Sequence, residues 1–273
     1  HYSHDYAQQL DFHSDPCQPW SIFFKTPYKC AIFGVCCESI PRQVNFLIDE
    51  NVLTGKGANA AISYVHYYFE RHGLGETCAQ IHADNCSAQN KNNIFLWYYL
   101  WRVMTGHHHD IEYNFLIAGH TKFSPDWSFG LLKQKTHKTF ISSLFDIARA
   151  VEESASVNTA ELVGLHNGMV RVPTYDWTTY TSQFFKKLPR LKGYHRCRFL
   201  KDHPGVIFCK DCTGHLRSAR LIFFKVKGIC HKSKCCHLWS ILKESIVNER
   251  NTCTRKFWNF VAQEVNNWDW LEF

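Results

Sequence analysis

The chain has 273 residues, of which 45% are hydrophobic and 15% aromatic, and this composition argues against a disordered protein. The longest apolar block, IFLWYYLWRVM at 94–104, is interrupted by Arg102 and is shorter than the roughly 18 apolar residues of a membrane helix, so we expect a soluble protein without membrane association. The formal net charge of +7 is compatible with a polyanionic partner but does not require one.

The first fifty residues show the pattern of short β-strands. Apolar and aromatic runs alternate with proline, aspartate and glycine, which favour turns. We expect three short strands, or a meander, at residues 1–10, 20–26 and 31–50.

Helices and strands alternate in the next seventy residues. Ile62, Val65, Tyr68 and Phe69 recur at helical spacing and glycine follows in HGLG, which predicts a helix at 58–71. Further elements are expected in ETCAQIHAD (strand, 76–84), NNIFLWYYLWRVMTG (helix, 92–106, apolar all round and so buried) and IEYNFLIAGH (strand, 111–120). This order predicts a mixed α/β sheet with helices on its faces.

The pattern becomes mainly helical after about Lys138. We expect helices in SSLFDIARAVEESAS and DWTTYTSQFFKKL, a β-hairpin within 205–228 and a helical tail at 239–265. The sequence therefore predicts a core at 1–140 and a C-terminal region at 141–273, packed on the core or forming a small subdomain.

The thirteen cysteines are expected to be reduced thiols, because the chain is large, the count is odd and no leader is visible. The chain starts at His1 rather than Met, which suggests a fragment. Residues 209–237 have ligand-like spacing and predict a possible structural zinc site, although ordinary buried thiols are the alternative. Its candidate ligands are Cys209, Cys212, Cys230 and Cys235, with Cys236 and His237 beside them. The run GHHHD at 106–110 is interpreted as a solvated turn.

Three aspartates lie at suggestive places in the expected sheet. Asp5 lies in the first strand, Asp84 ends the strand at 76–84, and Asp126 follows the strand at 111–120. Ser124 is a suitable N-cap and Pro125 a suitable first helical residue, which places Asp126 in a first turn. Each acid alone is explained as a solvated or capping residue. Together they predict a site for two Mg²⁺ or Mn²⁺ ions, which prefer oxygen ligands and can assist phosphoryl displacement.

An amide-rich loop follows Asp84 in HADNCSAQNKNN. Its side chains could donate to phosphate or sugar oxygens and position a duplex without reading its sequence. The alternative is a turn and capping segment that leads into the next helix. The candidate nucleic-acid contacts are Asn85, Gln89, Asn90, Lys91 and Lys122.

The motifs HYSHDYAQQL, FLIDE, HADNCSAQNKNN, FLIAGHTKFSPDWSFGLLK and YDWTTYTSQFFKKL resemble a family of transposon-derived proteins of unknown function. That family is similar to DDE-type transposases with an RNase H-like core. The resemblance covers most of residues 1–200 and implies a five-stranded mixed sheet of order 3-2-1-4-5, with helices on both faces. It also implies DNA as the partner, a nuclear location and possible homo-oligomers.

The same resemblance assigns roles to individual residues. Asp5, Asp84 and Asp126 would be the catalytic, metal-binding acids, and Glu50 resembles the extra carboxylate of ribonuclease H enzymes. His120 could orient a phosphate or a carboxylate, although a core histidine is an equal alternative. Family members often carry Asp-Phe-Gly and a later Glu where this chain has SFGLLKQ, so that acidic helper is absent.

Three classes of function follow. The first is a DDE/DDD-type polynucleotidyl transferase that cleaves DNA and transfers strands, or a remnant of one. The second is a catalytically inactive nucleic-acid-binding protein of the same fold; converging carboxylates favour the first class, and a lysine or arginine in the metal position favours the second. The third is a thiol hydrolase using Cys86 with His120 or His82, which the acidic neighbour of Cys86 disfavours.

Overall fold

The computed structural model describes residues 1–12, 16, 27–51, 57–117, 123–165, 169–211 and 216–217. Within them, ten strands form one mixed sheet. The strands are β1 (Tyr2–Tyr6), β2 (Leu10–Phe12), β3 (Tyr28–Cys37), β4 (Arg42–Asp49), β5 (Cys78–Ala83), β6 (Asp110–Phe115), β7 (Asn158–Leu162), β8 (Arg196–Leu200), β9 (Ile207–Lys210) and β10 (Leu216–Arg217). Nine of them follow the order β10-β9-β8-β6-β5-β1-β3-β4-β7, and β2 pairs with β3 beside this path.

The described helices lie between these strands in the sequence. They are α1 (Ala58–Arg71), α2 (Asn93–Met104), α3 (Ser124–Thr136), α4 (Leu144–Ser154) and α5 (Trp177–Ser182), with a 3-10 turn at Leu191–Gly193. The predicted helix at 58–71 is confirmed at both ends, and α2 is buried along most of its length as its apolar sequence predicts. The prediction of a mixed α/β protein is thus confirmed. No helix in the described part of the chain is long and apolar enough to cross a membrane.

Strand direction fixes where functional side chains can meet. β1 is parallel to β5 and β5 is parallel to β6, whereas β3 is antiparallel to both β1 and β4. The carboxyl ends of β1, β5 and β6 therefore lie at one edge of the sheet. Loops that follow parallel strands at such an edge commonly build binding sites.

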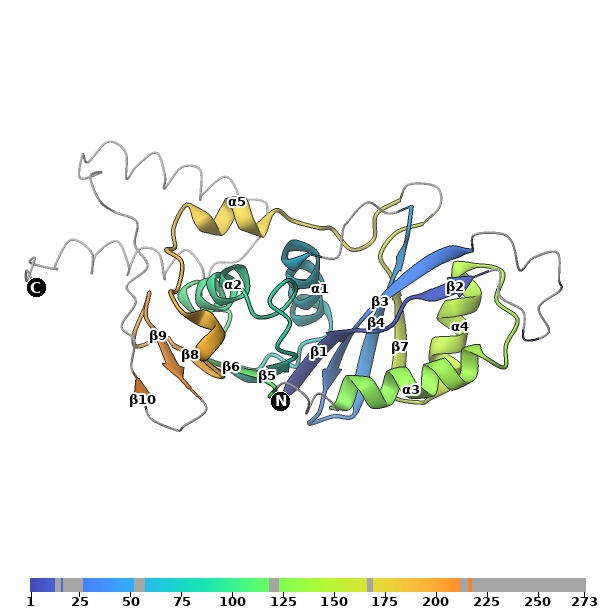
Figure 1. Cartoon of the computed structure of the whole chain (residues 1–273), viewed down its shortest axis with the longest axis horizontal. Coiled ribbons are helices and arrows are strands. Elements are labelled where there is room, and N and C mark those ends of the chain that lie inside the picture. The colour runs from blue at the N-terminus through green and yellow to red at the C-terminus, as the bar shows by residue number, and fades with distance from the viewer. Residues whose placement is uncertain are drawn as a thin grey trace, which may run out of the picture.

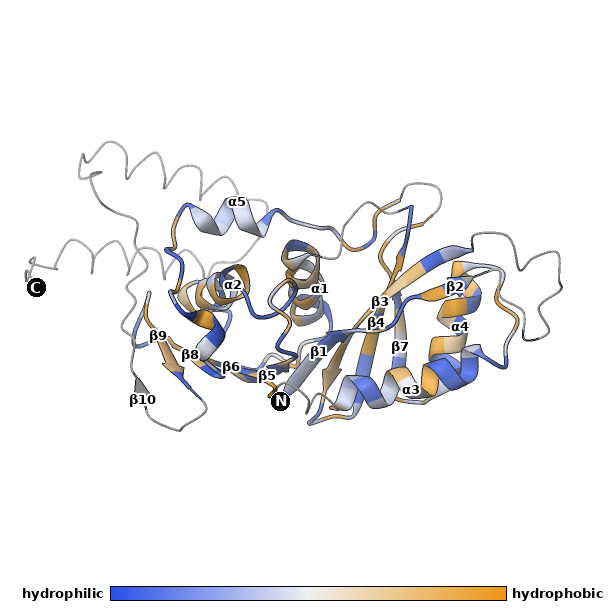
Figure 2. Ribbon diagram, in the orientation of Figure 1, coloured by the Kyte–Doolittle hydropathy of each residue, from blue (hydrophilic) through white to orange (hydrophobic). Residues whose placement is uncertain are grey.

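Helices cover the two faces of the sheet unequally. α1, α2 and α5 lie on one face, and α3 and α4 lie on the other over β3, β4 and β7 (Figure 1). The larger core is aromatic and includes the fully buried Phe46, Tyr64 and Phe95. The smaller core joins α4 to β3 and β4 through Leu144, Ile147 and their neighbours, and Figure 2 shows apolar and polar segments alternating along α4.

Two strands from the second half of the chain join the edges of this sheet. β7 pairs in parallel with β4, and β8 pairs with β6. The described part of 141–273 is therefore built into the same sheet as residues 1–140, and the sheet exceeds the five strands expected. β9 and β10 form part of the predicted hairpin, whereas the expected strand at 20–26 and the helical tail at 239–265 lie outside the described residues.

The run at 106–110 forms a turn in which Gly106 and His109 are exposed as expected, but His108 is buried. His108 is 2% exposed and accepts a hydrogen bond from Arg102 Nε at 3.2 Å, and Arg102 is itself buried. Arg102 also donates to Glu70 at 3.0 Å and lies 4.8 Å above the ring of Phe69. His108 is buried because its ring accepts a hydrogen bond from a buried arginine.

Candidate functional site

Asp5 and Asp84 lie next to each other at the carboxyl ends of two neighbouring parallel strands. The register pairs His4 of β1 with Ala83 of β5, and each acid is the next residue along its strand. His4 packs against Phe95 of α2, so the neighbouring side chain of Asp5 points to the opposite face of the sheet, and Asp84 follows directly after the last residue of β5. The sequence placed Asp5 in a strand and Asp84 at a strand end, and the resemblance to DDE-type transposases implied that the two lie side by side.

The pKa of Asp5 depends in part on how close Asp84 lies. Burial, and then the negative charge of Asp84, raise the pKa of the Asp5 carboxyl to about 7, and Asp126 adds a smaller effect of the same sign. The backbone N–H of Tyr6 donates to Asp5 Oδ1 at 2.8 Å and opposes this rise in the pKa. An empty site of this kind holds a proton near neutral pH, and a cation that neutralised the cluster would release it.

The amide-rich loop folds back on Asp84. The backbone N–H of Cys86 donates to Asp84 Oδ1 at 3.1 Å, and the side-chain amide of Asn90 makes a short hydrogen bond to the same oxygen. Asn90 is fully buried, and its backbone carbonyl oxygen accepts a hydrogen bond from Tyr113 Oη at 3.1 Å. The loop therefore fixes the direction of one carboxylate.

This packing corrects two predicted nucleic-acid contacts. Asn90 and Lys91 are 0% and 4% exposed, so their side chains do not face a polyanion. Lys91 Nζ donates instead to the carbonyl oxygen of Lys192 at 3.0 Å and lies 5.0 Å above the ring of Phe115. Asn85 and Gln89 remain partly exposed, and Lys122 lies outside the described residues.

Asp126 lies in the first turn of α3, as expected, and is exposed. The helix starts one residue earlier than predicted: Phe123 is the N-cap, and its backbone N–H donates to Asp126 Oδ2 at 3.3 Å. Ser124 is the first helical residue and donates to Glu38 Oε1 at 3.0 Å. This contact holds the first turn of α3 near the end of β3, beside β1.

A close approach between α3 and the sheet allows this arrangement. Gly34 pairs with Asp5 across β1 and β3, and a Cβ at Gly34 would lie 2.7 Å from the ring of Phe129 on α3. Ser128, also on α3, donates to the side-chain oxygen of Asn158 in β7. Glycine on the strand and a buried polar contact beneath the helix thus place α3 over Asp5.

Glu50 is not part of the acidic site. The backbone N–H of Lys29 donates to Glu50 Oε2 at 3.1 Å, at the far end of β3. Gly34, the partner of Asp5, is five residues away, roughly 16 Å along a strand. The prediction failed because β4 runs past the level of Asp5 before it ends. His120 lies outside the described residues.

Only one of the four proposed zinc ligands lies within the described residues. Cys209 is buried and its sulfur lies 3.3 Å from that of Cys197, its partner across β8 and β9. The other proposed zinc ligands, Cys212, Cys230 and Cys235, lie outside the described residues. Among the described residues, no group of three His, Cys, Asp or Glu side chains is arranged to hold a metal ion.

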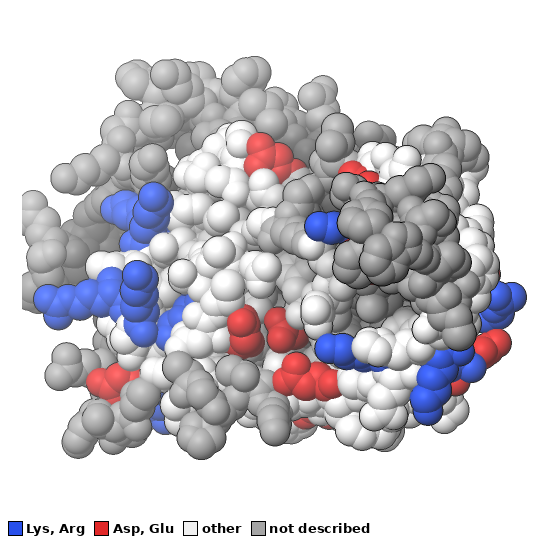
Figure 3. All heavy atoms as spheres, turned by 45° about the vertical axis from the view of Figure 1, so that its right-hand side comes forward, with Lys and Arg blue, Asp and Glu red and all other residues white. Residues whose placement is uncertain are grey.

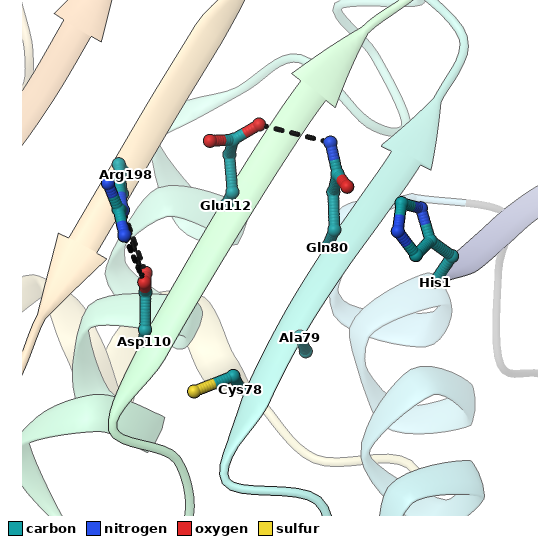
Figure 4. Close-up of a pocket in the computed structure, with 7 residues that line it drawn as sticks. All are labelled: His1, Cys78, Ala79, Gln80, Asp110, Glu112 and Arg198. Carbon is teal, nitrogen blue, oxygen red and sulfur yellow. Dashed lines mark hydrogen bonds and ion pairs between the residues drawn. The ribbon is translucent and has the colours of Figure 1, made fainter.

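The open face of β5, β6 and β8 carries polar residues that sequence reasoning missed. A shallow pocket there is lined by alternating side chains of these strands, and its polar groups largely satisfy each other (Figure 4). Arg198 forms an ion pair with Asp110, and Gln80 donates to Glu112 at 3.1 Å. The alternation of polar and apolar residues in DIEYNF and RCRFL was the available signal.

Together these features define a mixed α/β protein with an acidic site where parallel strands end. Figure 3 shows acidic side chains grouped near the middle of one face, with basic side chains to either side. The chain belongs to the family described as Domain of unknown function (DUF7869), whose profile matches residues 26–213, more than half of its length. The match includes Asp84 and Asp126 and begins after Asp5. No match was found among curated proteins or solved structures.

Proposed function

We propose that the protein is a DDE/DDD-type polynucleotidyl transferase, or a close derivative, that cleaves DNA with divalent metal ions. The observation that carries this proposal is the closeness of Asp5 and Asp84 at adjacent carboxyl strand ends, with the pKa of Asp5 raised by burial and then by the charge of Asp84. In the described residues neither of them, nor Asp126, forms an ion pair with lysine or arginine. A cation from the protein does not take the metal position there, which favours chemistry over binding alone.

The strand order supports an RNase H-like core. Within the larger sheet, the path β4-β3-β1-β5-β6 follows the order 3-2-1-4-5, with the first three strands of the chain in this path antiparallel and the last two parallel to β1. In this interpretation β7 and β8 to β10 are additions at the two edges. The RNase H-like assignment also explains why an acid follows β5 and another begins α3.

The donor set suits hard divalent cations. Asp5 and Asp84 supply carboxylate oxygens from the sheet, and Asp126 supplies a third from the α3 first turn. Bound Mg²⁺ or Mn²⁺ would activate water or a DNA 3′-hydroxyl and stabilise the leaving oxygen. Asp5 must lose its proton before it can bind a divalent cation. Asn90 holds the carboxylate of Asp84 in one orientation for the same cation. Asp126 must approach the other two acids, because the described residues lack a closed three-ligand group.

Nicking of supercoiled plasmid tests this proposal. We expect Mg²⁺- or Mn²⁺-dependent nicking by the native chain and a loss of at least about 100-fold in Asp84→Asn and Asp126→Asn, since each removes a metal ligand. Asp146→Asn is the matched control, because Asp146 is also a first-turn acid, at the N-terminus of α4. Nicking that survives both site substitutions, or that falls equally in Asp146→Asn, would contradict the proposal.

A further inference from the structure

We propose, on the basis of the function proposed above, that residues 186–192 form the surface that holds the phosphodiester backbone of the DNA beside the acidic site. The segment reads KKLPRLK, and no acidic residue occurs between Asp176 and Asp202. Its basic residues, Lys186, Lys187, Arg190 and Lys192, are all exposed, and we refer to them as the basic strip. None of them forms an ion pair with a carboxylate in the described part of the chain.

Apolar side chains hold the basic strip on the protein. Phe185, Leu188 and Leu191 are 5%, 3% and 8% exposed and belong to the aromatic core. They alternate with the basic residues, so that the segment buries one side and presents its cations on the other. A segment that was only a solvated linker would not need three core residues within seven positions.

Hydrogen bonds tie the same segment to α2 and to the loop that carries Asp84. The carbonyl oxygen of Lys186 accepts from Trp97 Nε1 at 2.9 Å, and the backbone N–H of Leu188 donates to Asn93 Oδ1 at 2.6 Å. The carbonyl oxygen of Lys192 accepts from the buried Lys91 at 3.0 Å. Lys91 directly follows Asn90, the residue that orients Asp84, so two neighbouring buried residues connect the basic strip to the acidic site.

The backbone at Arg190 has an unusual conformation for a residue with a side chain. Arg190 has a φ of 56° and lies in the left-handed region, where glycine is normally preferred. Such conformations persist mainly where surrounding structure imposes them, and they cluster at functional sites. Arginine at this position keeps a cation at the centre of the basic strip at the expense of local stability.

Nucleic acid is the occupant that fits this surface. Four exposed cations, none paired with a carboxylate among the described residues, stand on a segment anchored in the core and can contact backbone phosphates. Such contacts position a duplex without reading bases. Figure 3 shows acidic side chains near the middle of one face with basic side chains to either side, so the face offers both signs of charge. Without the basic strip, a site formed by three acids would repel the DNA.

Fluorescence anisotropy with a short labelled duplex of random sequence, in the absence of divalent ions, tests the basic strip separately from cleavage. We expect Lys186→Gln with Lys187→Gln, and Arg190→Gln with Lys192→Gln, each to weaken binding about tenfold or more at low salt. Each pair should also reduce the slope of log affinity against log salt by about 2. The control pair is Arg42→Gln with Arg71→Gln, two exposed arginines at the start of β4 and the end of α1, away from the carboxyl ends of β1 and β5, and should bind like the native chain.

Arg190→Gly separates binding from folding. Glycine relieves the left-handed backbone, so the melting temperature should rise while DNA affinity falls. Strip variants that bind DNA as tightly as the control pair would overturn the proposal that the basic strip binds DNA. Plasmid nicking by the native chain would in that case still support the proposed function. Conversely, strip-dependent binding without any metal-dependent nicking would support the basic strip and count against catalysis.

Discussion

Asp5→Asn is expected to stabilise the metal-free protein at pH 8 by about 2–4 kcal/mol, and to change its stability little near pH 4. The folded-state pKa of Asp5 is raised to about 7 by burial and by the charge of Asp84. A raised carboxyl pKa means that the folded state binds the proton more tightly than the unfolded state. Stability of the native chain therefore falls as pH rises from about 4 to 7, and asparagine removes that loss.

Urea unfolding of both proteins between pH 4 and pH 8 measures this difference. Asp146→Asn should behave in the opposite way, because hydrogen bonds from Ser142 and Ser143 lower the pKa of Asp146. Its carboxylate contributes stability above its unfolded-state pKa, so asparagine should destabilise the protein at neutral pH. An Asp5→Asn difference that does not grow with pH would mean that neither burial nor the charge of Asp84 raises the pKa of Asp5 in solution.

Asn90→Ala is expected to weaken metal-dependent nicking because it lowers the affinity for the metal ion, and not because it unfolds the protein. Loss of a residue that orients a metal ligand typically costs about 10–100-fold in metal affinity or activity. Asn90 donates to Asp84 from a fully buried position, so alanine leaves the carboxylate free to turn. The Mg²⁺ or Mn²⁺ concentration for half-maximal nicking should rise accordingly.

The control for Asn90 lies two residues away. Asn92 caps α2 by accepting from the backbone N–H groups of Ile94 and Phe95, and serine can keep that cap. Asn92→Ser should therefore leave the metal midpoint unchanged. If Asn90→Ala lowers the melting temperature and the maximal rate while its metal midpoint matches that of Asn92→Ser, the residue supports folding only.

The sequence predicted those parts of the site that depend on strand ends. Asp84 follows an alternating strand, and Asp5 lies in another, so their approach follows from parallel pairing alone. Glu50 shows the limit of this argument, because the number of residues by which β4 passes Asp5 is set by the β3–β4 register. Periodicity identifies a strand but does not fix its register with a neighbour.

Side-chain direction was the other quantity that the sequence left open. Asn90 and Lys91 have the composition of a phosphate-binding loop, yet the turn that begins at Asp84 directs both inward. The exposed cations come instead from KKLPRLK, about a hundred residues later in the chain. Its alternation of buried leucines with basic residues is visible in the sequence, but its contact with the Asp84 loop is a tertiary feature.

Binding of Mn²⁺ between Asp5 and Asp84 is the central claim of this account. A crystal grown with Mn²⁺ and measured for anomalous scattering tests it most directly. We expect manganese coordinated by the carboxylates of Asp5 and Asp84, with Asp126 drawn towards it. Saturating Mn²⁺ that leaves these two acids without metal, or that binds only at other carboxylates such as Asp110 and Glu112, would contradict it.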